Sequence, residues 1–187
     1  MVDRIPVGRG PAGVTVGGGQ VWVANQLDGT VSEVNPAAGV VVATIGVGNG
    51  PEAVASGYGS VWAANVTDST LSRIDPGSSR VVATIPLDSP PTGLAAGDRG
   101  IWVTGADTER LVLVDPRTNR VSRAVPVGSS PAGVAVGAGG VWVADASGSV
   151  ARFDPRTGHL HSIKTAGSPA GPTPSTCAPA SGTPPER

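Results

Sequence analysis

The feature that most constrains the fold of this chain is an internal repeat of 40 residues. The repeat is marked by its four tryptophans, Trp22, Trp62, Trp102 and Trp142. Prolines recur at the same interval, at positions 11, 51, 91 and 131, as do glycines at positions 17, 57, 97 and 137. Self-similarity at a fixed interval is the signature of a repeat architecture. The chain is therefore expected to hold four copies of one unit, at about residues 8–47, 48–87, 88–127 and 128–166.

Each copy has the pattern of four short strands separated by turns. In the first copy these strands are expected at residues 12–16, 20–25, 30–35 and 40–45, with Gly or Pro between them. A meander of this size can bury its apolar faces only by stacking on neighbours, as the blades of a β-propeller do. We therefore predict an all-β fold, a partial β-propeller of four four-stranded blades of 40 residues each. A parallel β-helix is the main alternative, but it would use shorter coils and fewer hairpin turns.

The best-preserved segments of the repeat resemble a known family. They are Asn-Val-Thr-Asp-Ser-Thr-Leu-Ser-Arg-Ile-Asp-Pro at 65–76 and Arg-Val-Val-Ala-Thr-Ile-Pro at 80–86. These resemble the YVTN repeat of bacterial β-propellers, and the resemblance covers nearly all of residues 2–165. The chain is also similar to the propeller of virginiamycin B (streptogramin) lyases and to propeller modules of bacterial signalling proteins. The resemblance implies a fold and relatives that are often extracytoplasmic, but no particular function, since unrelated sites are built on one fold.

Both ends of the chain interrupt the repeat. Residues 5–8 match residues 125–128, which end the third copy, so the chain opens with an outer strand whose blade is missing. Residues 167–171 resemble the opening of a fifth copy, and the rest of 167–187 is a Pro/Ser/Thr-rich tail that we expect to be disordered. Because the resembling families close with about six to eight blades, a fragment or module of a larger bacterial protein is favoured.

Two consequences for assembly follow from these ends. An open array of blades exposes strand edges and apolar faces, so self-association is expected, with a homodimer favoured over a monomer. The alternative is a compact four-bladed ring, in which residues 3–7 act as a clasp and displace the degenerate outer strand at residues 159–164.

The tryptophan column could be a stacking platform for ligands or part of the core. Trp22 alternates with Val21 and Val23 along its strand, so it points to the other face of the sheet. The same residue recurs in every copy, which is what packing between blades requires. A core role is therefore predicted for the four tryptophans.

The best candidate for a binding site is the set of polar residues in two kinds of loop that share one end of a propeller. These are the loops between the second and third strands and those between blades. The candidate ligand-binding residues are Asn25, Asp28, Asn65, Asp68, Asp107, Arg110 and Asp145. Together they could hold a cation, an amine-bearing small molecule or a protein. Asn and Asp also stabilise turns by bonding their own backbone, and for any single residue that role is favoured.

Composition limits the partners and the cofactors. The formal net charge is −1 and no basic cluster occurs, so nucleic acid is not expected as a partner. Residues 1–8 lack the pattern of a signal peptide, and no apolar run is long enough for a membrane helix. The compartment stays unassigned. The single cysteine, Cys177, permits no intrachain disulfide or thiolate metal cluster, and no cofactor is predicted.

Catalytic groups are scarce. The two histidines, His159 and His161, are two apart on an outer strand, far from a central channel. The resemblance to the lyases implies a histidine and a glutamate acting with magnesium in the channel, and no loop here carries a matching histidine. The predicted function is therefore a noncatalytic scaffold that binds a ligand or protein. Two alternatives stay open: a fragment of a lyase-like enzyme whose catalytic blade lies outside this chain, and a structural repeat without a ligand.

Overall fold

The computed structural model describes residues 4–164, all of which form strands, turns or connections without a helix. The predicted tail at 167–187 lies outside these residues. Blade 1 contains β1 (Pro11–Gly17), β2 (Gln20–Asn25), β3 (Thr30–Asn35) and β4 (Val40–Gly46). Blade 2 contains β5 (Pro51–Gly57), β6 (Ser60–Asn65), β7 (Thr70–Asp75) and β8 (Arg80–Pro86). Blade 3 contains β9 (Pro91–Gly97), β10 (Gly100–Gly105), β11 (Arg110–Asp115) and β12 (Arg120–Pro126). Blade 4 contains β13 (Pro131–Gly137), β14 (Gly140–Asp145), β15 (Ser149–Phe153) and β16 (Leu160–Lys164).

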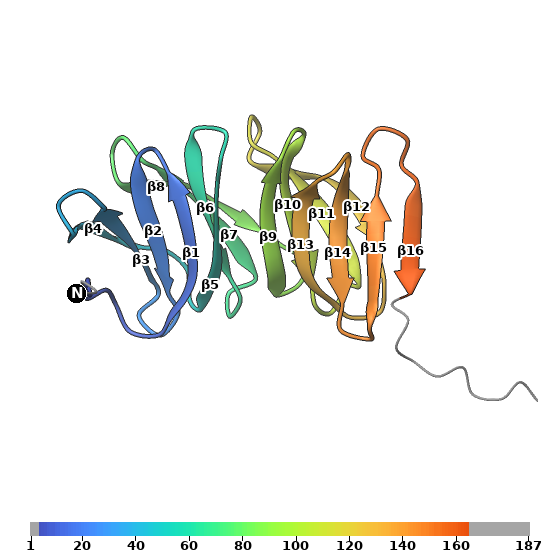
Figure 1. The fold of residues 1–187 in the computed structure, drawn as a ribbon, viewed down its shortest axis with the longest axis horizontal. Helices are drawn as coiled ribbons and strands as arrows, with labels where there is room; N and C mark the ends of the chain where they lie inside the picture. Colours follow the sequence, from blue (N-terminus) through green and yellow to red (C-terminus); the bar gives the residue numbers. More distant parts are fainter. Residues whose placement is uncertain (1–3, 165–187) are drawn as a thin grey trace, which may run out of the picture.

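Each blade is an antiparallel sheet in which the strands pair in chain order. The four sheets stand side by side along the molecule (Figure 1), with the first strand of each blade next to the first strand of the following one. This confirms the predicted all-β propeller of four four-stranded blades. Within residues 4–164 no helix is present that could cross a membrane.

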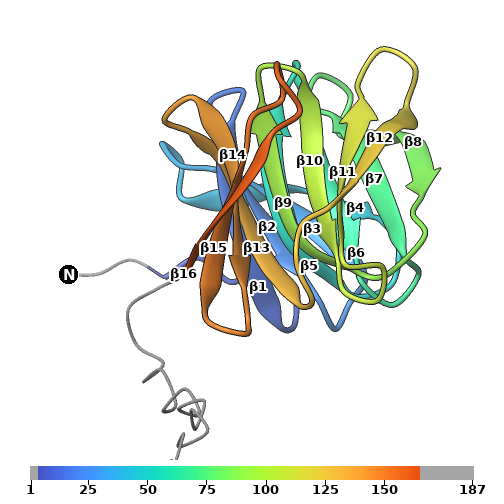
Figure 2. The same ribbon diagram turned by 90° about the vertical axis from the view of Figure 1, so that its right-hand side faces the viewer.

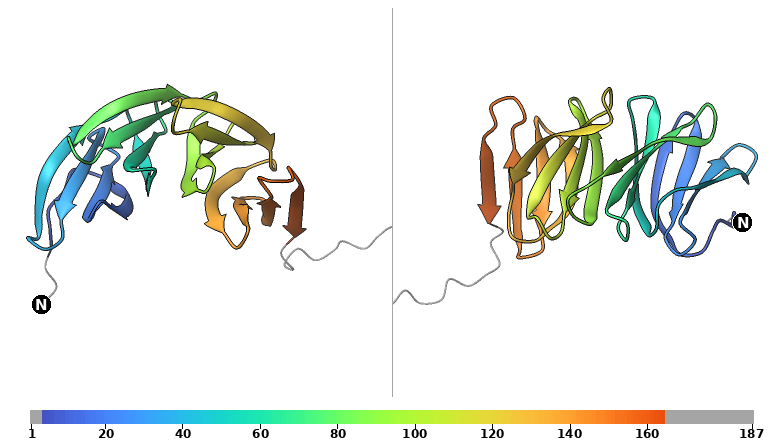
Figure 3. Two further views of the ribbon diagram at one scale, coloured as in Figure 1. Left: turned by 90° about the horizontal axis from the view of Figure 1, so that it is seen from above. Right: turned by 180° about the vertical axis from the view of Figure 1, so that it is seen from behind.

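The blades form an arc rather than a closed ring. Seen from above, blades 1 and 4 lie at the two ends of the arc and do not meet (Figure 3). Residues 4–7 belong to no sheet, and β16 keeps its place beside β15. The clasped four-bladed ring is therefore wrong, because the edge of β15 is already paired with β16. The open arrangement agrees with the predicted partial propeller.

Blades stack because each sheet has two apolar faces. Trp22 and Ala24 point to one face of blade 1, whereas Val21 and Val23 point to the other, since side chains alternate along a strand. We call the first the Trp face and the second the valine face, and use the same names for the equivalent positions of every blade. The Trp face of blade 1 packs on the valine face of blade 2 in one cluster: Trp22, Ala24, Val31, Ile45, Val54, Val61, Ala63 and Ile74. Equivalent clusters join blades 2 and 3 and blades 3 and 4.

The tryptophans are buried, as the predicted core role requires, wherever a following blade covers them. Trp22 and Trp62 are 0% exposed and Trp102 is 1% exposed. Each of Trp22 and Trp62 also donates its indole N–H to the carbonyl of a glycine five residues earlier, at 3.0 Å. Trp142 is only half-buried, because blade 4 is the last of the four described blades and none of their sheets stands in front of it (Figure 2).

Glycine is needed on the Trp face where two blades approach most closely. A Cβ atom on Gly57 would lie 2.5 Å from the Cβ of Ala96 in blade 3, and one on Gly97 would lie 2.6 Å from a methyl group of Val136 in blade 4. Gly17 has the same relation to Ser56. The periodic glycine column is therefore a contact between blades as well as the start of a turn.

Candidate functional site

The arc has two ends at which loops could form a site. We call the lower end in Figure 1 the loop end; it carries the loops between second and third strands and the connections between blades. The upper end, called the turn end, carries the turns between first and second strands and between third and fourth strands. The sequence predicted a binding site at the loop end.

Asn25 and Asn65 occupy equivalent places at the loop end, and both are completely buried. The amide of Asn65 donates hydrogen bonds to Thr70 Oγ1 at 3.0 Å and to Ser72 Oγ at 2.9 Å, within its own blade. A Cβ on Gly48 would lie only 2.7 Å from this amide nitrogen, so the blade connection packs directly against it. These two asparagines thus bond to the following strand of their own blade and pack against the connection between blades.

Replacing Asn65 with alanine is expected to destabilise the protein by about 1–3 kcal/mol, because the buried hydroxyl group of Ser72 and the half-buried one of Thr70 lose their partner. Chemical denaturation measures this change. Asp107→Ala is the matched control, since this loop-end side chain is exposed and its loss should change stability by less than about 0.5 kcal/mol. Unchanged stability of Asn65→Ala together with loss of a ligand would instead make Asn65 a ligand-binding residue.

Asp28 and Asp68 tie the same two segments together from the solvent side. Asp68 accepts hydrogen bonds from the backbone N–H of Asn49 at 2.7 Å and from its side-chain amide at 2.9 Å. Asp28 does the same with Arg9, through the backbone N–H at 2.7 Å and through Nε in an ion pair at 2.6 Å. These hydrogen bonds, the backbone one first, hold the pKa of both carboxyl groups below its ordinary value.

The lowered pKa of Asp68 makes a prediction about acid stability. The contact contributes fully above the ordinary pKa of 3.8 and is lost as the pH falls through the lower pKa of the folded state. Wild type should therefore lose more of its melting temperature than Asp68→Asn between pH 6 and about pH 2. Thermal unfolding followed by circular dichroism measures this difference, with Asp107→Asn as the control. An identical acid response of wild type and Asp68→Asn would show that the contact does not form.

Asp145, the fourth-copy equivalent of Asn65, is likewise buried and engaged. One carboxylate oxygen accepts from the N–H of Ser147 at 2.8 Å and the other from the N–H of Ser130 at 3.1 Å. Asp107 and Arg110 differ, because both side chains are exposed and neither has a hydrogen-bond partner within residues 4–164. Five of the seven predicted site residues thus hold the loops in place, and two are presented to solvent. The structure does not gather the seven into one cluster, and their role in binding stays a prediction.

A hollow lies at the turn end, opposite the loop end, between blades 3 and 4. Its volume is about 750 Å³. Three turns surround it, at residues 97–99, 137–140 and 154–156, and Trp102 and Val141 form its floor. A second hollow of about 410 Å³ adjoins it on the blade 2 side and shares Asp98 and Arg99 with it. The turn between β9 and β10 therefore separates two neighbouring depressions.

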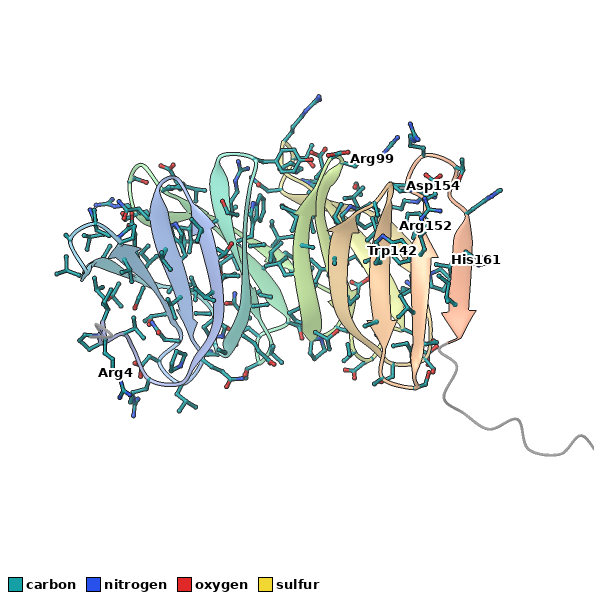
Figure 4. All side chains as sticks on the ribbon, in the orientation of Figure 1. Arg4, Arg99, Trp142, Arg152, Asp154 and His161 are labelled. Atoms are coloured by element: carbon teal, nitrogen blue, oxygen red, sulfur yellow. The ribbon has the colours of Figure 1, made fainter. Side chains whose placement is uncertain are left out.

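The rims of these hollows carry arginines without a hydrogen-bond partner and aspartates that already accept hydrogen bonds. Arg99, Arg117 and Arg156 are exposed, and none of their guanidinium groups has a hydrogen-bond or ion-pair partner among the described residues. In contrast, Asp115 accepts the N–H of Arg117 and Asp154 that of Arg156, both at 2.8 Å. Figure 4 shows Arg99 and Asp154 at this end of the molecule. The free hydrogen-bonding groups are mainly cationic donors.

The sequence contains a signal for the turn end in the positions where the copies of the repeat differ. At the turn between first and second strands, blades 1, 2 and 4 have a glycine where blade 3 has Arg99. At the turn between third and fourth strands, blades 1 and 2 have Ala37 and Gly77 where blades 3 and 4 have Arg117 and Arg156. In a repeat protein the shared positions maintain packing, so departures of this kind mark candidate function.

The described residues present little catalytic chemistry. His159 and His161 are exposed beside and on β16, and Figure 4 places His161 on the outer strand of blade 4. No group of three His, Cys, Asp or Glu side chains within residues 4–164 could hold a metal ion.

Comparisons with known proteins support the fold. The sequence matches no protein-family model and no curated protein. Among solved structures, Kuenenia stuttgartiensis hydrazine synthase matches with a TM-score of 0.76 and 16% identity, over 87% of this chain and 52% of that one. A streptogramin B lyase matches with a TM-score of 0.75 and 21% identity, over 85% and 56% of the two chains. The WD40 repeats of RRP9 match with a TM-score of 0.74 and 12% identity, over 82% and 51%.

These matches bear on the extent of the array. The chain spans about half the length of each matched structure. The predicted likeness to the propeller of streptogramin lyases is confirmed at the level of the fold, whereas the YVTN repeat stays a resemblance. This chain therefore has the β-propeller fold, with four blades in the described residues.

Proposed function

We propose that this chain is a noncatalytic binding propeller that takes a carboxylate-bearing segment of a protein partner at the turn end of blades 3 and 4. The observation that carries the proposal is the group of three guanidiniums around the two hollows that have no hydrogen-bond or ion-pair partner within residues 4–164: Arg99, Arg117 and Arg156. A guanidinium presents five N–H donors in a fork that matches a carboxylate. The rigid turns fix the positions of the three backbones, which lowers the entropy lost on binding.

The charge balance at this end indicates how the partner is recognised. Asp98, Asp115 and Asp154 offset the three arginines in formal charge. Long-range attraction is therefore weak, and recognition depends on short-range hydrogen bonds to the guanidinium groups. Such a site favours a segment with a few well-placed carboxylates over a uniformly acidic one.

The test is binding of fluorescently labelled peptides that carry spaced Asp or Glu residues, followed by anisotropy. Replacing both Arg99 and Arg156 by alanine is expected to weaken binding at least about tenfold, the equivalent of ~1.4 kcal/mol. Arg80→Ala is the matched control, since this exposed arginine of β8 lines neither hollow. The double replacement of Asp107 and Arg110 by alanine tests the loop end instead.

Each outcome selects one function. Loss of binding only on replacement of Arg99 and Arg156 supports the proposal, whereas loss only with the loop-end variant moves the site to the surface that the sequence predicted. Absence of binding to every peptide contradicts the proposal and leaves the structural repeat without a ligand.

A lyase activity is the second candidate, favoured by the likeness to the streptogramin B lyase structure at 21% identity. Incubation with a streptogramin B and mass spectrometry of the product tests it. We expect no conversion, because the histidines of this chain lie at the outer strand of blade 4 and not beside the first strands.

A further inference from the structure

Two sheet faces of the described arc have no blade packed on them. One is the valine face of blade 1, where Val14 is 66% and Val16 is 70% exposed. The other is the Trp face of blade 4, where Trp142 and Val150 are half-buried and Ile163 is 41% exposed. The equivalent residues inside the arc are covered; for example, Leu71 and Leu111, which correspond to Val150, are both 0% exposed.

These two faces are the two halves of a contact that the molecule already makes three times. At each internal junction a Trp face packs on a valine face, as Trp22 packs against Val54, Val61 and Ile74. The half-buried Trp142 lacks such a set, and its counterparts at the other end of the described arc are the exposed Val14, the half-buried Val21 and the buried Val34. Each face therefore fits the opposite end of another copy and not itself.

Glycine positions make this fit specific. Gly17, Gly57 and Gly97 receive the side chain at one fixed position of the next blade, namely Ser56, Ala96 and Val136. Gly137 is the fourth member of this series, and nothing lies within 4 Å of where its Cβ would be. By the same spacing its counterpart is Val16, the most exposed of the large apolar side chains described. The empty space beside Gly137 and the exposed side chain of Val16, which has the matching position, thus lie at opposite ends of the arc.

A polar contact between neighbouring blades is also incomplete at the Trp face of blade 4. At the junction of blades 2 and 3, Arg73 stacks on Trp62 with 5.0 Å to the ring centre and donates to the carbonyl of Pro116 in the next blade at 2.5 Å. Arg152 is its equivalent in blade 4 and lies 5.8 Å from the centre of the Trp142 ring. Figure 4 labels both side chains on blade 4. The Nη2 of Arg152 donates to the carbonyl of Gly139 at 3.0 Å, and its Nε has no hydrogen-bond partner in the described part of the chain, where Gly140 replaces the Ser60 that accepts the Nε of Arg73. No carbonyl of a following blade accepts from Arg152 within the described residues, as that of Pro116 accepts from the Nη1 of Arg73. The group equivalent to the Pro116 carbonyl is that of Pro36, on blade 1.

We infer that the partner of both faces is a second copy of this chain, and that two copies close into one eight-bladed ring. Each copy places its Trp142 face on the Val14 and Val16 face of the other, so the ring contains two identical new junctions. A head-to-tail contact closes only if its rotation completes a circle. The chain covers 52% and 56% of two matched chains, so two copies together are about as long as one of those chains. The arc seen in Figure 3 leaves room for the second copy on its open side.

The first experiment is light scattering coupled to size exclusion, over a wide range of concentration. The chain has a mass of 18.4 kDa, and a species of twice this mass is expected to form as the concentration rises. Gly137→Val fills the socket that Val16 would enter and is expected to shift the species to monomer. Val16→Glu, which places a charge on the opposite face, should have the same effect. Both positions are open in the single copy, so neither change should prevent folding.

Gly46→Val is the matched control, because it introduces the same side chain where nothing lies within 4 Å. The equivalent residue of blade 2, Pro86, stays exposed although its junction is closed, so this variant should remain a dimer. A monomer at every concentration would overturn the inference and assign the faces to further blades or another protein. A ladder of larger species would overturn closure by two copies. Neither outcome bears on the peptide-binding proposal, which concerns the turn end within one copy. Because Gly137 also lines the turn-end hollow, peptide binding is measured on the wild type and the arginine variants and not on Gly137→Val.

Discussion

Replacing Trp62 with alanine is expected to lower the free energy of unfolding by about 3–5 kcal/mol. Trp62 is fully buried between blades 2 and 3, where it packs with Leu71, Ile85 and Ile101. Its loss removes apolar contact on both sides of the junction, and the facing blades cannot close the space because their strands are fixed by neighbours. Denaturant titration followed by tryptophan fluorescence and circular dichroism gives the change.

Trp142→Ala is the internal comparison for this prediction. Its half-buried ring covers only one face of one blade in a single copy, so at low protein concentration the cost should be below about 2 kcal/mol. Equal costs for Trp62→Ala and Trp142→Ala would contradict the assignment of Trp62 to a junction between blades.

Gly57→Val is expected to destabilise the protein by at least about 1–3 kcal/mol. The new Cβ would lie 2.5 Å from the Cβ of Ala96, which is attached directly to the backbone of β9 and cannot turn away. Blades 2 and 3 must therefore separate or shift. The same substitution at Gly137 meets nothing within 4 Å, and valine suits an exposed strand, so the cost in a single copy should be near zero.

The comparison of these two variants depends on measurement at low concentration, where junctions between copies do not contribute. Thermal unfolding at matched dilution shows the difference. If Gly57→Val unfolds at the temperature of Gly137→Val, the close approach of neighbouring blades is incorrect.

The fold could be predicted from the sequence because the residues that form the contacts between blades recur in every copy of the repeat. Trp22 and Gly17 recur in all four copies, and each maintains a contact between neighbouring blades. Alternation along residues 20–25 assigned the tryptophans to one face, and the structure buries three of the four. The fourth, Trp142, is only half-buried, because its burial depends on a following blade. Alternation within one strand does not reveal whether such a blade is present.

The site was harder to predict because residue type does not distinguish a side chain that binds a ligand from one that binds its own loop. The sequence predicts Asn65 and Asp68 as binding residues because they are polar loop residues, yet the pairing of β6 with β7 directs the Asn65 amide at Thr70 and Ser72. The cluster of Arg99, Arg117 and Arg156 comes from two different kinds of turn in two blades. Arg156 lies at the same hollow as Arg99 because blades 3 and 4 stack, and this stacking is not visible in the spacing within a copy.

The open four-bladed arc is the central claim, and small-angle X-ray scattering of the Gly137→Val variant at low concentration tests it most directly. The scattering profile is expected to match an arc in which blades 1 and 4 remain apart, with the Trp face of blade 4 and the valine face of blade 1 uncovered. A profile that instead fits a compact closed ring of four blades, with blade 1 in contact with blade 4, would contradict it.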